Sequence, residues 1–133
     1  MIACKAAIPL MKAQGGGHIV NISSTAGLFV GSGTSGYCAS KFAVEAFSSA
    51  LRLEVSKADR IRITVVEPGL VETDLATHIS DPNLRQGFLD SVASIEQLQP
   101  EDIAAAVVYA VTQPPRVSVN QLLIRPTDSD TQL

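Results

Sequence analysis

Two short apolar runs separated by a long helical stretch constrain the fold of this chain most strongly. Residues 18–22 read HIVNI, and residues 60–67 read RIRITVVE. Four apolar residues of the second run are β-branched: Ile61, Ile63, Val65 and Val66. Such runs are typical of short strands buried in a parallel sheet. Residues 36–57 carry apolar side chains at helical spacing, so the order strand, helix, strand predicts a parallel βαβ arrangement.

The rest of the chain continues this alternation. Residues 1–13 have a helical apolar face, with Pro9 expected to bend or shorten the helix. Residues 74–99 predict one or two short amphipathic helices, and Pro100 opens a last helix at a favoured first-turn position. Residues 119–125 predict a final strand. The sequence therefore predicts the α/β class, with three parallel strands and flanking helices.

Tyr37 and Lys41 are the residues most suggestive of chemistry. They lie four positions apart in the predicted helix, and Ser23 and Ser24 follow the first strand. Side chains four apart on a helix share a face, and a cation close to a phenol lowers its pKa from near 10 by about 1 to 3 units. Tyr37 is then expected to exchange protons near neutral pH, while a serine hydroxyl holds the reacting oxygen. This set suits the interconversion of alcohols and carbonyls.

The run GHIVNISSTAG at residues 17–27, followed by YCASK at residues 37–41, resembles the active-site segment of the short-chain dehydrogenases/reductases. In that family the catalytic serine precedes the tyrosine by thirteen positions, which favours Ser24 over Ser23. The resemblance implies an NAD(P)-dependent oxidoreductase that transfers hydride between a nicotinamide cofactor and an alcohol or carbonyl substrate. Tyr37 would be its acid/base, Lys41 would lower the pKa of Tyr37 and hold the cofactor ribose, and Ser24 would polarise the carbonyl.

The segment PGLVET at residues 68–73 is similar to the PGxVxT segment of the same family. The family uses it to contact the nicotinamide half of the cofactor. The resemblance thus implies a cofactor-binding set: Tyr37, Lys41, Pro68, Gly69, Val71 and Thr73. The ending LIRPT at residues 123–127 also resembles a subgroup that acts on small hydroxy acids and aldehydes with NADP, so NADP is favoured over NAD. In the family the region that corresponds to residues 74–99 closes over the substrate. An ordinary surface segment without this role fits these residues equally well.

The resemblance covers residues 1–133 only as the second half of such an enzyme. The glycine-rich dinucleotide turn and the strands before it have no counterpart in the sequence. The glycines at residues 15–17 match neither GxGxxG nor a P-loop, and they follow a predicted helix and precede a strand, the reverse of the order that those motifs require. We therefore expect a partial Rossmann-like catalytic domain that belongs to a longer protein. The alternative is a truncated, catalytically inactive remnant that acts at most as an oligomerisation or interaction module.

Helix 36–57 bears more apolar residues than one face of a helix needs. In the resembled family this helix packs against a second subunit, and a homo-oligomer formed through residues 36–57 is therefore expected. A fully buried helix in a monomer is the other interpretation.

Charge and composition limit the remaining classes of function. The net charge of -3 offers no basic face for nucleic acid or acidic lipid. Two cysteines and two widely separated histidines predict neither a disulfide framework nor a metal site. No stretch is long enough to span a membrane, and a cytoplasmic location is expected with a small-molecule substrate as the partner.

Overall fold

A three-stranded parallel sheet forms the centre of the protein in the computed structural model, which describes residues 1–129. The end of the predicted domain, residues 130–133, lies outside the described part. The strands are β1 (Gly17–Ile22), β2 (Ile61–Pro68) and β3 (Gln121–Ile124), in the order β1-β2-β3. Both pairings are parallel. The predicted α/β class is confirmed.

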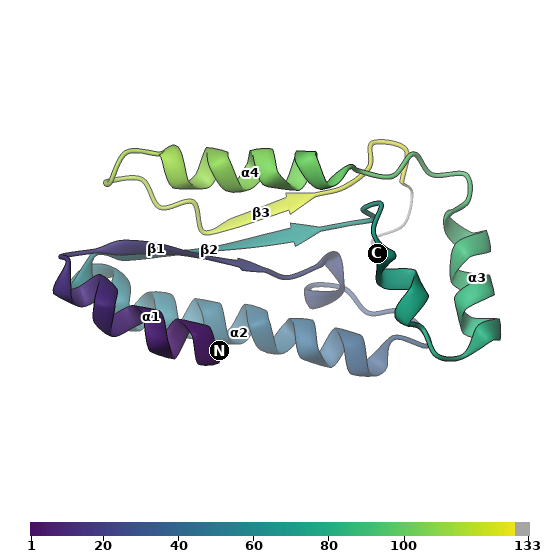
Figure 1. The fold of residues 1–133 in the computed structure, drawn as a ribbon, viewed down its shortest axis with the longest axis horizontal. Helices are drawn as coiled ribbons and strands as arrows, with labels where there is room; N and C mark the ends of the chain where they lie inside the picture. Colours follow the sequence, from purple (N-terminus) through teal and green to yellow (C-terminus); the bar gives the residue numbers. More distant parts are fainter. Residues whose placement is uncertain (130–133) are drawn as a thin grey trace.

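Helices cover both faces of the sheet, as Figure 1 shows. α1 (Ile2–Ala13) and α2 (Ser35–Asp59) lie on one face, and α4 (Pro100–Thr112) lies on the other. Beyond the carboxyl ends of the strands lies α3 (Pro82–Val92). Two short 3-10 turns complete the elements, η1 (Thr25–Gly27) after β1 and η2 (Asp74–His78) after β2. Within residues 1–129 no helix combines the length and the apolar character that crossing a bilayer requires.

The core lies around β2 because this strand is the central one. Its four apolar β-branched residues are all completely buried: Ile61, Ile63, Val65 and Val66. One cluster joins the sheet to α1 and α2: Cys4, Ile19, Leu51, Val55, Ile61 and Ile63. Burying such a side chain contributes about 1.5 to 3 kcal/mol to the stability of the fold. Strand β2, which its β-branched residues predicted, therefore holds the sheet against the layer formed by α1 and α2.

The ends of the helices differ from the sequence-based expectations in two places. Pro9 does not end α1, which continues to Ala13, because Ile8 and Met11 on either side of it pack against the core. α2 begins at Ser35 and ends at Asp59, where residues 36–57 were predicted. The preceding Thr34 donates from its hydroxyl to the Gly31 carbonyl (2.8 Å) and caps no helical N–H. Tertiary packing thus outweighs the local signal of Pro9 in α1.

Polar side chains recur at helical spacing on one face of α2: Tyr37, Lys41, Glu45, Ser48 and Arg52. Ser48 is fully buried and accepts a hydrogen bond from Nδ2 of Asn21 on β1 (2.8 Å). Arg52 donates from Nε to the Ile63 carbonyl and from a terminal nitrogen to the Asn120 carbonyl, both at 3.0 Å. These bonds fix the rotation of α2 about its axis, and with it the direction of Tyr37 and Lys41.

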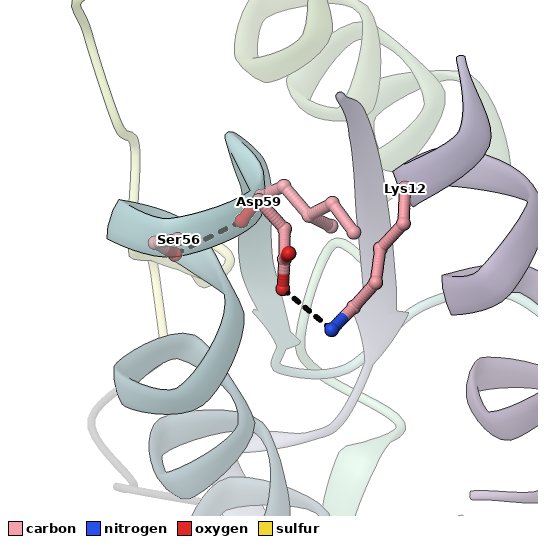
Figure 2. Close-up of polar contacts among 4 residues, drawn as sticks. Lys12, Ser56 and Asp59 are labelled. Carbon is pink, nitrogen blue, oxygen red and sulfur yellow. Dashed lines mark hydrogen bonds and ion pairs between the residues drawn. The ribbon is translucent and has the colours of Figure 1, made fainter. Parts of the chain in front are cut away.

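An ion pair joins α1 and α2 at the opposite end of the sheet, between Lys12 and Asp59 (Figure 2). Nζ of Lys12 lies 2.8 Å from Oδ2 of Asp59. The Lys12 side chain is 48% exposed, so water screens the attraction. We expect Lys12→Ala to cost no more than about 1 kcal/mol of unfolding free energy. A double-mutant cycle with Asp59→Ala, followed by urea denaturation, measures the coupling. A coupling energy above about 2 kcal/mol would contradict this assignment of the pair as a weak surface contact.

Candidate active site

The loops that follow β1 and β2 meet at the carboxyl edge of the sheet. The Ser23 N–H donates to the Val66 carbonyl (2.7 Å), which ties the end of β1 to β2. The Gly69 N–H donates to the Ile124 carbonyl (2.7 Å), which ties the end of β2 to β3. Open parallel sheets bind their ligands at this edge, and the predicted site residues lie on the segments that leave it.

The two adjacent serines have different environments. Ser23 is buried, and its Oγ has no hydrogen-bond partner among residues 1–129. Ser24 is half-buried and precedes η1, where its Oγ accepts a hydrogen bond from the Ala26 N–H (3.1 Å). This bond orients the Ser24 oxygen and leaves its own O–H free to donate. The geometry therefore suits Ser24, more than Ser23, for contact with a ligand.

Tyr37 and Lys41 lie on the first turns of α2, which packs against η1. The Lys41 ammonium is 5.6 Å from the centre of the Tyr37 ring and donates to the Ile22 carbonyl at the end of β1 (3.3 Å). Tyr37 is 39% exposed. Its hydroxyl makes no hydrogen bond within the described part of the chain. The arrangement offers an accessible phenol with a fixed positive charge beside it.

The segment after β2 offers backbone groups. Val71 forms a parallel bridge with Leu98, in which the Leu98 N–H donates to the Leu70 carbonyl (3.0 Å) and the Glu72 N–H donates to the Leu98 carbonyl (2.9 Å). Because the neighbours of Val71 make these bonds, the N–H and C=O of Val71 itself point away from Leu98. The exposed Thr73 precedes η2 and accepts from the Leu75 N–H (3.3 Å). Pro68 is buried at the end of β2 and sets where the segment leaves the sheet.

Comparison with known proteins places this chain in a family. The family model described as short chain dehydrogenase matches residues 1–84. The chain belongs to the short-chain dehydrogenase family. The family resemblance inferred from the residues around Ser24 and Tyr37 is therefore confirmed.

Relatives of this short-chain dehydrogenase chain are named as oxidoreductases. An uncharacterised oxidoreductase of Staphylococcus saprophyticus is 40% identical over 123 residues, which are 92% of this chain and 49% of the relative. The glycine betaine reductase of Emericella nidulans is 42% identical over 121 residues, 91% of this chain and 9% of that protein. The chain thus spans half or less of the length of these relatives.

Solved dehydrogenase structures share the fold. The closed form of a serine dehydrogenase complexed with NADP+ superposes with a TM-score of 0.84 at 32% identity, over 96% of this chain and 51% of that one. A 7α-hydroxysteroid dehydrogenase complexed with NADH and 7-oxo glycochenodeoxycholic acid gives 0.71 at 26% identity, over 91% and 48% of the two chains. The Rossmann-like arrangement predicted from the sequence is confirmed.

Sequence reasoning missed two buried carboxyl groups in this short-chain dehydrogenase chain, Glu45 on α2 and Glu67 on β2. Burial first, and then the charge of Glu45, raise the pKa of Glu67 to about 7, while the Gln121 amide and Arg52 act in the opposite direction. Glu45 stands four residues after Lys41, so it lies on the same helical face. The spacing between Lys41 and Glu45 was the only sign in the sequence that Glu45 lies near the site. Nothing in the sequence indicates that Glu67 packs against Glu45.

Proposed function

We propose that the protein is an NAD(P)-dependent oxidoreductase that transfers hydride between a nicotinamide cofactor and an alcohol or carbonyl substrate. This chain would supply the proton-transfer residues of the catalytic domain. The single observation that carries the proposal is the exposed Tyr37 hydroxyl beside the Lys41 ammonium, which lies 5.6 Å from the Tyr37 ring at the carboxyl edge of the sheet. Membership of the short-chain dehydrogenase family supports the same reaction class.

The three side chains have complementary roles in this proposal. Tyr37 gives its proton to the substrate oxygen during reduction and takes it back during oxidation. The positive charge of Lys41 stabilises the negative charge that develops on the Tyr37 oxygen as the proton leaves. The free O–H of Ser24 donates to the substrate carbonyl and stabilises the charge that grows there. The nicotinamide, when bound, supplies or accepts the hydride.

The residues of the chain also suit the cofactor. The unused N–H and C=O of Val71 can pair with a carboxamide, which needs one donor and one acceptor. Thr73 and Lys41 can hold hydroxyl or phosphate oxygens, while Pro68 and Gly69 shape the turn beneath them. We favour NADP over NAD because the serine dehydrogenase complexed with NADP+ has a higher TM-score to this chain than the 7α-hydroxysteroid dehydrogenase complexed with NADH. The segment that contains η2 and α3, beyond the strand ends, would cover the substrate.

The proposal is tested by NAD(P)H oxidation in the full-length protein with a panel of aldehydes, ketones and small keto acids. We expect turnover by the wild type. In Lys41→Met we expect kcat to fall about 10²-fold or more and the Kd for cofactor to rise, because the variant loses both the charge and the donor. Lys57→Met, at an exposed lysine of the same helix, is the matched control and should behave as the wild type. A Lys41→Met enzyme with wild-type kcat and Kd would overturn the proposal.

A homo-oligomer is the proposed assembly, and the exposed apolar side chains of α2 support it. Phe42 is exposed on this helix, and Leu53 is 86% exposed. Such residues on one helix are suited to an interface between subunits. The same surface favours the alternative function of an interaction module without catalysis. Measurable turnover in the assay above would exclude that alternative.

A further inference from the structure

Two acidic side chains meet in the interior beneath the candidate active site. Glu67 is 1% exposed and Glu45 is 9% exposed. Oε1 of Glu67 accepts a hydrogen bond from Nε2 of Gln121 on β3 (2.9 Å). The Glu45 carboxyl lies within hydrogen-bonding range of the Glu67 carboxyl. Helix α2 and strand β2 therefore contact each other through two groups that are ordinarily both anions.

The state of ionisation decides whether this contact is favourable. Neither oxygen of Glu45 has a donor among residues 1–129 if both carboxyls are ionised. A single proton between them removes the repulsion and gives one oxygen of each carboxyl a hydrogen-bond partner, since one carboxyl then donates to the other. Buried polar atoms are seldom left without a partner, so the protonated pair is the arrangement that this packing favours.

The surrounding charges do not supply the missing donor. Arg52 is the cation that acts on both carboxyls. Its hydrogen bonds go instead to the carbonyls of Ile63 and Asn120. Lys41, one turn earlier on α2, donates to the Ile22 carbonyl. On β3 the neutral Gln121 donates to Glu67, and the neutral Ser23 lies, like Glu45, against Gly27.

Glu45 also contacts the loop that carries Ser24. A Cβ placed on Gly27 would lie 3.1 Å from Cγ and 3.2 Å from Oε1 of Glu45, and 2.7 Å from Oγ of Ser23. The absence of a side chain at Gly27 is what allows this approach. A shift of Glu45 would therefore move both the turn after Ser24 and the helix that bears Tyr37 and Lys41.

We propose that Glu45 and Glu67 share one proton and act as positioning residues, joining α2, β2 and the loop of residues 23–27 so that Ser24, Tyr37 and Lys41 stay aligned. The catalytic part of this inference rests on the proposed function, whereas the shared proton does not. Loss of the proton to solvent leaves two carboxylates in contact, and their repulsion loosens the same three segments. Above the pH at which this happens, both stability and alignment should decline.

The sign of the pH dependence follows from the ionisation. The pKa of Glu67 is raised to about 7 in the folded protein from an ordinary 4.5. Between these pH values the folded state binds more protons than the unfolded state, so stability falls as pH rises. His18 opposes this trend, because burial and Arg62 lower its pKa. The test therefore compares variants with the wild type, which cancels the His18 contribution.

The first experiment measures urea unfolding of the full-length protein and of Glu67→Gln from pH 4.5 to 8. The glutamine amide can donate to Glu45 at every pH. We expect the ratio of unfolding constants, wild type over variant, to rise by up to about tenfold per pH unit between roughly pH 5 and 7 and then to level off. Glu54→Gln, at an exposed glutamate of α2, should give a constant ratio. A Glu67→Gln ratio that is flat or falls with pH would overturn the shared proton.

The second experiment tests positioning. We expect Glu45→Gln to retain kcat and to lose the decline in kcat of the wild type above about pH 7, whereas Glu45→Ala should lower kcat at every pH without raising KM for the substrate. If Glu45→Gln keeps the wild-type kcat, the hydrogen bond between residues 45 and 67 is what positions the site. If it does not, a negative charge at residue 45 is required. Equal kcat in Glu45→Ala and the wild type would overturn the positioning role. If no substrate is turned over at all, the proposed function fails while the unfolding ratio still decides the shared proton.

Discussion

Tyr37→Phe should lower kcat by about 10²- to 10⁴-fold, the usual contribution of a general acid or base. The substitution removes one oxygen and keeps the ring that lies beside the Lys41 ammonium. Because the Tyr37 hydroxyl makes no hydrogen bond within the described residues, its loss leaves no buried group unpaired. The free energy of unfolding should therefore change by less than about 0.5 kcal/mol.

Steady-state kinetics and cofactor titration of the full-length protein measure this effect. The cofactor Kd should stay within a few-fold of the wild type, so the loss would lie in the chemical step. Tyr109→Phe is the matched control, since Tyr109 is exposed on α4 and has no part in the proposed site. A Tyr37→Phe enzyme that works as fast as Tyr109→Phe would remove Tyr37 from the mechanism.

Gly27→Ala should destabilise the protein and impair catalysis together. The added methyl would meet Oγ of Ser23 at 2.7 Å and Glu45 at 3.1 Å, and neither can retreat easily because both are buried. Overpacking of this kind costs about 1 to 3 kcal/mol. Relief of the clash has to move the turn that orients Ser24, so we expect kcat to fall by about tenfold or more.

Gly87→Ala provides the comparison for this glycine. Gly87 lies inside α3, and a Cβ there would meet no atom within 4 Å. Alanine favours a helix over glycine by about 0.5 to 1 kcal/mol, so the control should be slightly more stable than the wild type. Urea denaturation gives both values. If Gly27→Ala were as stable as Gly87→Ala, the close contact between Glu45 and the loop would be wrong.

Local patterns made much of the fold predictable. The β-branched run of β2 identified a buried strand because such residues fit a pleated surface covered on both sides. The NISSTAG and YCASK motifs identified the family, and the site residues that they imply stay a prediction. The boundaries of α2 were less predictable, because its first residue is Ser35 and its end is set by Arg60 in the left-handed conformation.

The sequence by itself determined the alternation of strands and helices, the family, and the pairing of Tyr37 with Lys41. Each of these depends on residues a few positions apart, where helical and strand periodicity act directly. Only the tertiary structure decided that Glu45 meets Glu67, that Gly27 lies against Glu45, and that the peptide groups of Val71 point away from Leu98. These contacts join separate segments, and they arise from the packing of α2 on the sheet and from the bridge between two loops.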